Sequence, residues 1–340
     1  VIVIQYIILG DFLMDDQSKP QLEDGTGEQH QSDTFEIDEV DLPNVNDEEI
    51  YLEHCRIKCI SKLSRFPNVR SLCLRNNLLK KLENFEPISQ TLEDLDVYDN
   101  QITKIENLEC LTKLTNLDLS FNRIRRIENL ENLSNLRKLY FVNNHISKIE
   151  NLSNLQDLEL LELGSNKIGK LENLDGLKKL TELYCGKNKI PTMENLDNLT
   201  NLTILSIQGN RLTKIDGLTS LVNLEQLYLS ENGITEIEGL ETLSKLQILD
   251  LAYNFISQIK NMSNLENLEE FWCNDNKISD WEQLEKLSVL KKLRTLYMER
   301  NPIYFLSTDR TKHDSNYRRK ILLALPNLQQ LDANLTGVGI

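Results

Sequence analysis

The chain has 340 residues and a formal net charge of −15 at pH 7, with 40% hydrophobic and 27% charged residues. Glycine and proline together number only 20, which excludes collagen-like and Pro/Gly-rich low-complexity classes. The negative charge is concentrated at one end, because residues 1–49 hold 14 acids and one base. The remainder is nearly balanced, and we expect no basic stripe, which argues against a protein that binds nucleic-acid backbones.

Residues 1–45 precede the pattern that organises the chain. The apolar run Val1–Leu9 is shorter than the ~20 residues that span a bilayer, and it lacks the basic start and the cleavage site of a secretory signal. Because the chain does not begin with Met, we interpret residues 1–13 as either the end of a fragment or a gene-model artefact. The rest of this segment is acidic and poor in large apolar residues, so we expect residues 1–45 to be a disordered tail. An arm that tunes the binding of a partner is the alternative.

An internal repeat organises everything after the tail. One Asn marks each unit, and the eight consecutive steps from Asn100 to Asn122, Asn144 and onward to Asn276 all have the same period, 22. The unit reads LxxLxLxxNxIxxIxxLxxLxx, the leucine-rich-repeat pattern. It predicts one α/β solenoid over residues 46–340, with about 12 turns. We expect a parallel β-sheet on its concave face and short helical or 3-10 turns on its convex face.

Each position of the unit has a physical role. Both leucines of L-x-L point into the solenoid, and the residue between them faces the concave surface. The Asn turns inward, where it can hydrogen-bond backbone groups of adjacent turns that are otherwise buried and unpaired. We expect the acid after the second Ile to be structural and to start a convex helical turn. These acids are Glu106, Glu128, Glu150, Glu172, Glu194, Asp216 and Glu238.

Both ends of the solenoid need closing, because a terminal turn without a neighbour exposes the core. Cys55 stands where the first Asn of the series would be, so we expect an irregular N-terminal turn over residues 46–66. Residues 302–335 are predicted to form the C-terminal cap. In this cap a helix begins at Tyr317, and a strand-like LxxL precedes Asp332.

No pattern in the chain predicts catalysis, a cofactor or a metal. Six cysteines are scattered without a CxxC pair and the four histidines do not cluster, so we expect reduced thiols and no zinc site. Carboxylates on an open sheet, without a neighbouring His, nucleophile or phosphate loop, do not predict an enzyme. Matches to N-x-S/T, such as Asn132–Ser134, are spelled by the repeat itself and do not predict an extracellular glycoprotein.

The middle residue of each L-x-L segment faces the concave surface, so packing in the core does not determine its type. Tyr and Trp are over-represented at the centres of protein interfaces, and carboxylates between them suit a partner with Lys and Arg. An ordinary polar sheet face is the alternative. The middle residues of successive L-x-L segments are Cys73, Asp96, Asp118, Tyr140, Glu162, Tyr184, Ser206, Tyr228, Asp250, Trp272 and Tyr297.

Several motifs resemble those of the leucine-rich-repeat regulatory subunits of protein phosphatase 1, the regulatory subunit 7 family. They include LDLSFN, LELGSNKI, LYLSENGI, EFWCNDNKI, LYMERNP and YRRKILLALP. The resemblance implies a non-catalytic nuclear and cytoplasmic protein whose concave face binds the phosphatase catalytic subunit. It further implies an influence on the maturation, localisation or activity of that subunit, a role in mitosis, and a third inhibitory or regulatory protein in the complex. Neither a nucleic-acid nor a membrane partner is expected.

The resemblance also implies which residues contact the phosphatase. On matching motifs they are Asp118, Tyr140, Glu162, Tyr184, Asp250, Glu270, Trp272 and Tyr297. Tyr140 and Tyr184 stand where the family often has Phe, and the stretch Tyr304–Ser315 is longer than the family pattern. The alternative function is a leucine-rich-repeat adaptor for another intracellular protein, such as a splicing or cytoskeletal protein.

Overall fold

The computed structural model describes residues 36–37, 40, 44–306 and 310–337. The chain divides after Asp33, and every described residue belongs to the second unit, Thr34–Ile340. The predicted tail over residues 1–45 therefore lies almost entirely outside the described residues. Ile37 is an exception that departs from the prediction, because it is fully buried in the core. Its carbonyl accepts a hydrogen bond from Arg65 Nη1 at 3.1 Å.

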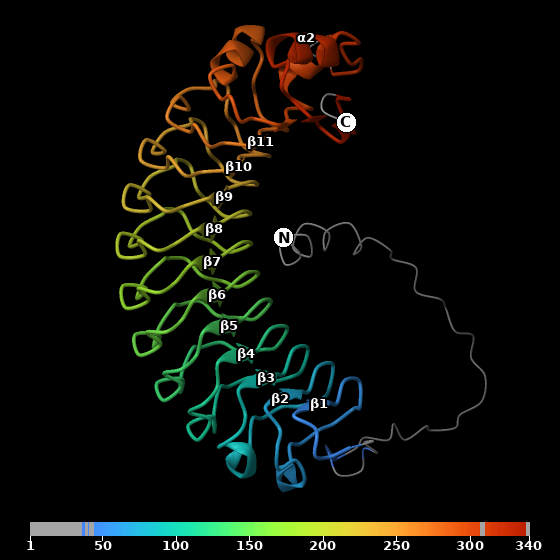
Figure 1. Cartoon of the computed structure of the whole chain (residues 1–340), viewed down its shortest axis with the longest axis vertical. Coiled ribbons are helices and arrows are strands. Elements are labelled where there is room, and N and C mark those ends of the chain that lie inside the picture. Colours follow the sequence, from blue (N-terminus) through green and yellow to red (C-terminus); the bar gives the residue numbers. More distant parts are fainter. Residues whose placement is uncertain (1–35, 38–39, 41–43, 307–309, 338–340) are drawn as a thin grey trace, which may run out of the picture. The chain divides into compact units, whose positions relative to one another are not determined.

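A single sheet runs through the second unit and lines the inner side of its curve (Figure 1). The strands follow one another in sequence order, and every pair from β1 to β13 is parallel. The strands are β1 (Glu49–Tyr51), β2 (Ser71–Cys73), β3 (Asp94–Asp96), β4 (Asn116–Asp118), β5 (Lys138–Tyr140), β6 (Leu160–Glu162), β7 (Glu182–Tyr184), β8 (Ile204–Ser206), β9 (Gln226–Tyr228), β10 (Ile248–Asp250), β11 (Glu270–Trp272), β12 (Thr295–Tyr297), β13 (Gln330–Leu331) and the antiparallel β14 (Asn334–Leu335).

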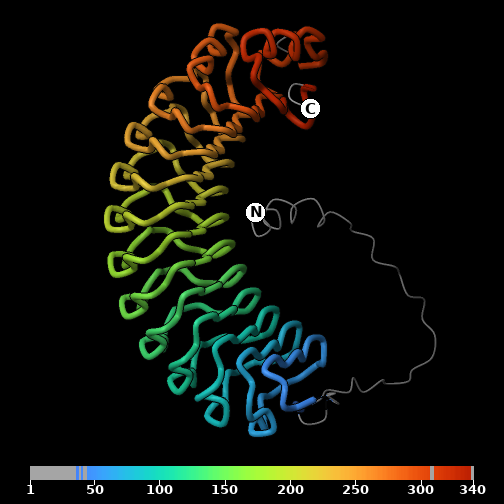
Figure 2. Tube along the Cα trace, in the orientation of Figure 1, coloured from blue at the N-terminus to red at the C-terminus, as the bar shows by residue number. Residues whose placement is uncertain are grey.

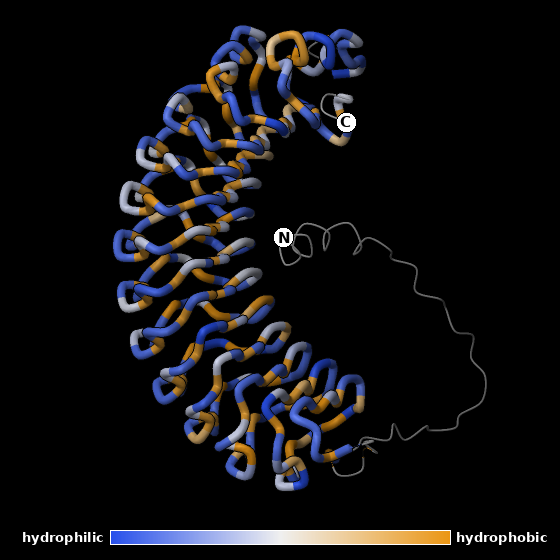
Figure 3. Tube along the Cα trace, viewed as in Figure 1, coloured by the Kyte–Doolittle hydropathy of each residue, from blue (hydrophilic) through white to orange (hydrophobic). Residues whose placement is uncertain are grey.

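The chain coils once in each repeat, and the coils follow one another along the solenoid (Figure 2). The core inside them consists mainly of leucine and isoleucine side chains that recur from turn to turn. In the turn of β4, Leu117, Leu119, Ile124 and Ile127 are all fully buried. Figure 3 shows the result as apolar and polar segments that alternate along each coil. Burying one such side chain stabilises the fold by about 1.5–3 kcal/mol. The predicted solenoid with its concave parallel sheet is confirmed.

An asparagine ladder joins each turn to its neighbours. The Asn166 side chain accepts a hydrogen bond from the Ile146 N–H at 3.0 Å and donates to the carbonyls of Phe141, Leu163 and Gly164 at 2.8–3.1 Å. The same arrangement recurs from Asn77 to Asn276. The inward turn of the repeat asparagine is therefore confirmed.

The convex wall differs from the prediction, because it contains few helices. Among the described residues, helical segments occur only at η2 (Leu63–Arg65), η3 (Glu86–Ile88), η4 (Trp281–Leu287), η5 (Pro302–Tyr304) and α2 (Tyr317–Ala324). None begins after the recurring acids, so the predicted helix-starting role of Glu106 to Glu238 is wrong. Several of these acids pair with bases instead, as Glu150 does with Arg126 at 3.2 Å.

A second asparagine ladder explains why no helix is needed. The residue after each acid has a positive φ, as at Asn173 (58°). The Asn173 amide donates to the Ile149 carbonyl of the preceding turn at 2.7 Å. Equivalent bonds come from Asn84, Asn107, Asn129, Asn151, Asn195 and Asn261. Gly217 and Gly239 occupy the same position, where a Cβ would collide with the carbonyls of Met193 and Ile215.

A helix and a short strand follow the last full turn of the solenoid. Helix α2 begins at Tyr317, and β13 extends the sheet beyond β12. The Tyr317 hydroxyl donates to Asp332 Oδ2 at 3.1 Å, while Asp332 Oδ1 accepts the N–H groups of Met298 and Glu299. Tyr304 contacts this cap, because its ring packs edge-on against that of Tyr317, with centroids 4.8 Å apart.

Candidate protein-binding face

Seven of the eight predicted contact residues lie in one row on the concave sheet. Each is the third residue of its strand, and the pairing places Asp118, Tyr140, Glu162 and Tyr184 side by side in register. Tyr228, Asp250, Trp272 and Tyr297 continue the row. Glu270 is the first residue of β11, so it lies two positions before Trp272 on the same face. We call the row from Cys73 to Tyr297 the concave row.

A carboxyl group between two tyrosines forms the centre of the concave row. Glu162 stands in register between Tyr140 and Tyr184, at the strand spacing of about 4.8 Å. Its Oε1 accepts the Gly164 N–H at 2.7 Å, and its Oε2 has no hydrogen-bond partner among the described residues. Burial raises the pKa of Glu162 to about 8. At pH 7 the group is therefore largely protonated, and because Oε1 accepts the Gly164 N–H, Oε2 carries the proton and can donate a hydrogen bond.

The same arrangement of acid and aromatic rings recurs in the C-terminal half of the row. Asp250 stands in register between Tyr228 and Trp272, and burial raises its pKa to about 6. The rings of Tyr228, Trp272 and Tyr297 are in edge contact, with centroids 6.3 and 5.7 Å apart. The cluster is a contiguous, partly exposed aromatic surface, the kind of anchor that dominates protein interfaces.

At the N-terminal end of the row the acids already have a partner within the chain. The Arg75 guanidinium contacts Asp96 at 2.5 Å and Asp118 at 3.3 Å, and it lies over the Tyr98 ring at 4.5 Å. Burial, followed by the charge of Asp118, raises the pKa of Asp96 to about 6. The pairing of Arg75 with these acids was not predicted from the sequence. The signal was an arginine two residues after Cys73, one turn before Asp96.

The prediction that the concave row is freely exposed is wrong for three of the contact residues. Glu162, Tyr184 and Asp250 are only 3–5% exposed. The reason is the short spacing between strands, since a large ring covers a shorter acid on the neighbouring strand. Asp118, Tyr140, Glu270, Trp272 and Tyr297 keep part of their surface exposed. The concave face is thus a packed acidic and aromatic surface on which these five side chains remain partly accessible.

The expectation that the chain has no basic stripe is also wrong. Bases recur directly after the ladder asparagine on five consecutive turns, at the edge of the sheet where the strands end. Their spacing of one repeat unit was visible in the sequence. The overall charge balance did not indicate the stripe, because acids elsewhere in each repeat unit offset the charge of these bases. We call these five residues the basic rim: Arg123, His145, Lys167, Lys189 and Arg211.

Other chemistries have little support in the described part of the chain. It contains no group of three or more His, Cys, Asp and Glu residues placed to hold a metal ion. None of the six cysteines, all of which lie in the described ranges, is in a disulfide. None of the described helices is both long and apolar enough to cross a membrane.

The chain belongs to the leucine-rich-repeat family. The family model described as "Leucine Rich repeats (2 copies)" matches residues 90–132, 134–176, 178–220 and 222–267, just over half of the chain. Solved structures show the same fold. An internalin of Listeria monocytogenes superposes with a TM-score of 0.66 at 24% identity, over 84% of this chain and 87% of that one. A leucine-rich-repeat protein of Leptospira interrogans gives 0.59 at 22% identity, over 82% of each chain.

Shorter stretches of the chain are similar to relatives named protein phosphatase 1 regulatory subunit SDS22. The identity is 50% over 52 residues with the protein of Schizosaccharomyces pombe, which is 15% of each chain. It is 46% over 80 residues with that of Saccharomyces cerevisiae, which is 22% of this chain and 23% of the relative. A Caenorhabditis elegans homologue is 44% identical over 66 residues. The matched stretches span less than a quarter of these relatives.

Proposed function

We propose that this chain is a non-catalytic regulatory subunit that binds the catalytic subunit of protein phosphatase 1 through its concave row. The observation that carries the proposal is the in-register line of acids and aromatic rings from Asp118 to Tyr297. The names of the relatives that share stretches of sequence supply the identity of the partner.

The aromatic rings and the carboxylates of the concave face have different tasks in this proposal. Trp272 and Tyr297 anchor the interface by burying their exposed ring edges against the partner. Asp250 and Glu270 receive lysine or arginine side chains, which fixes the orientation of the partner. Arg75 holds Asp96 and Asp118 in place and leaves less negative charge at that end.

The test is binding of the purified catalytic subunit by the full chain and by Trp272→Ala. If Trp272 is an anchor, calorimetry will show a loss of about 2 kcal/mol or more in binding free energy. Phe255→Ala is a matched control, because Phe255 is also aromatic and 54% exposed but lies outside the concave row. It should bind like the unmodified chain. Equal affinity of all three proteins would overturn the assignment of Trp272.

The consequence of binding is a further part of the proposal. We propose that the chain holds the catalytic subunit in the nucleus and cytoplasm and alters its maturation, localisation or activity, including during mitosis. Phosphatase assay of the co-purified complex tests the effect on activity. Capture of a different intracellular protein as the main partner would favour the adaptor alternative, which shares the scaffold and differs only in what the concave row binds.

A further inference from the structure

The basic rim is a continuous column on the solenoid. Its five residues follow the ladder asparagines, and each backbone N–H donates to a carbonyl of the preceding turn at 2.8–2.9 Å. Arg123 bonds to Ile102 in this way, and Arg211 to Ile190. Because consecutive turns are one strand spacing apart, the five backbone positions follow one another at about 5 Å. All five residues are exposed.

The side chains of the basic rim are unpaired, unlike other bases of the same turns. Among the described residues, none of the five makes an ion pair or a side-chain hydrogen bond. Three residues further along the chain, Arg126, Lys170 and Lys214 each contact a carboxylate. Four of the five residues, all except the neutral His145, therefore carry uncompensated positive charge in a chain whose net charge is −15.

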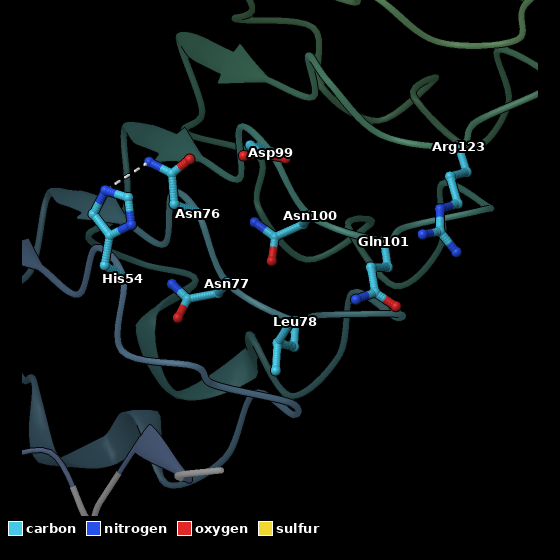
Figure 4. Close-up of a pocket in the computed structure, with 8 residues that line it drawn as sticks. All are labelled: His54, Asn76, Asn77, Leu78, Asp99, Asn100, Gln101 and Arg123. Carbon is cyan, nitrogen blue, oxygen red and sulfur yellow. Dashed lines mark hydrogen bonds between the residues drawn. The ribbon is translucent and has the colours of Figure 1, made fainter. Parts of the chain in front are cut away.

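A polar hollow continues the rim at its N-terminal end (Figure 4). It has a volume of about 370 Å³ and is lined by His54, Asn76, Asp99, Gln101 and Arg123, among others. Figure 4 shows the amides of Asn76 and Gln101 on its wall, with Asn76 hydrogen-bonded to His54 at 3.2 Å. Side-chain amides offer both donors and acceptors, which suit a peptide backbone.

The distribution of unpaired charge decides which polyanion the rim can bind. In three of the five turns the base three residues further on, Arg126, Lys170 or Lys214, contacts a carboxylate, so the unpaired positive charge is concentrated on the rim. A nucleic-acid duplex needs a broader unpaired basic face. A single nucleic-acid strand gains affinity from aromatic rings that stack on its bases, and the five rim residues include none. An extended acidic peptide needs only a narrow line of cations.

We propose that the basic rim binds an extended acidic segment of a partner protein, with the polar hollow receiving the end of that segment. This surface lies at the C-terminal edge of the sheet and does not use the concave row. The inference is therefore independent of the proposed phosphatase binding. The contact is electrostatic, so it should weaken strongly as salt is added.

The experiment measures fluorescence anisotropy of a labelled ten-residue glutamate peptide titrated with the full chain. The test variant is Lys167→Glu/Lys189→Glu. The control is Lys113→Glu/Lys178→Glu, which makes the same charge change at exposed lysines that precede the strands, on the other edge of the sheet. We expect the test variant to bind about tenfold more weakly and the control to change by less than about twofold.

Several results would overturn the proposal. They are absence of peptide binding, an equal loss in both variants, or tighter binding of a single-stranded oligonucleotide of the same charge. Binding that appears only after Glu23, Asp24 and Glu28 are changed to amides would show that the chain's own acidic segment occupies the rim. Trp272→Ala should leave peptide binding unchanged, which separates this inference from the proposed function.

Discussion

The Glu162 carboxylate is seated on the backbone of Gly164. Its Oε1 accepts the Gly164 N–H at 2.7 Å, and a Cβ at residue 164 would come equally close to that oxygen. A Cβ at this position would force the carboxylate to move. This contact fixes the direction of the Glu162 side chain. Among the described acids of the concave row, only Glu162 has a buried oxygen without a hydrogen-bond partner.

Gly164→Ala should therefore displace the carboxylate and break its hydrogen bond. We expect the free energy of unfolding to fall by about 1–3 kcal/mol, because the buried carboxyl loses its donor. The measurement is urea unfolding followed by circular dichroism. Gly169→Ala is the control, since a Cβ there meets no atom within 4 Å. A Gly164→Ala protein as stable as this control would contradict the seating of Glu162.

Stability should depend on pH through Glu162. Its pKa is raised by burial from 4.5 to about 8, so between these values the folded chain keeps a proton that the unfolded chain has lost. The free energy of unfolding should therefore fall as pH rises through this window and level off above it. Asp96 and Asp250, with pKa values of about 6, act in the same direction at lower pH.

The window between about pH 6.5 and 8 isolates Glu162 from these two acids. Glu162→Gln should flatten the fall in stability there, whatever its absolute stability, and exposed Glu241→Gln should not. Urea midpoints measured every half unit of pH provide the comparison. If the slopes of Glu162→Gln and the unmodified chain coincide, Glu162 ionises at its ordinary pKa in the fold.

Much of this fold could be predicted because each core position recurs once in every repeat unit. The period alone predicts that Leu117, Asn122 and Ile124 point into the core. The register of the concave row follows from the same period. The burial of Glu162 could not be predicted, because it depends on rings carried by neighbouring strands. The role of Asn173 was missed for a different reason. Its period was visible, but the acid before it was interpreted as a helix start, and positive φ values do not appear in a sequence.

The two asparagine ladders should differ in their contribution to stability. Asn166 is buried and makes four backbone hydrogen bonds, whereas the exposed Asn173 makes one. Asn166→Ala leaves several buried groups unpaired and should cost at least about 2–3 kcal/mol. Asn173→Ala should cost about 1–2 kcal/mol, from one bond and from a positive φ that alanine tolerates poorly.

Urea unfolding of both asparagine variants gives this ranking directly. Asn198→Ala serves as the control, because its single bond to Asp175 is on the exposed surface and should contribute less than about 0.5 kcal/mol. A loss for Asn173→Ala that equals or exceeds that for Asn166→Ala would reverse our assignment of the principal ladder.

The C-terminal cap provides a test of how the solenoid ends. Tyr317→Phe removes the hydroxyl that donates to Asp332 Oδ2, while Asp332 Oδ1 still holds the N–H groups of Met298 and Glu299. We expect a local loss of about 1–2 kcal/mol, because the buried carboxylate loses one donor. Since each turn contacts only its neighbours, opening should be confined to the last turns.

Amide hydrogen exchange measures this local opening in the Tyr317→Phe protein. Exchange should accelerate at the Asp332 and Cys273 N–H groups, which bond to the carbonyls of Leu296 and Tyr297, and should be unchanged at Leu163 in the centre of the sheet. Tyr51→Phe is the matched control, because its hydroxyl contacts Glu49 at the exposed first strand. Uniform acceleration along the chain would mean that the cap and the central turns unfold as one unit.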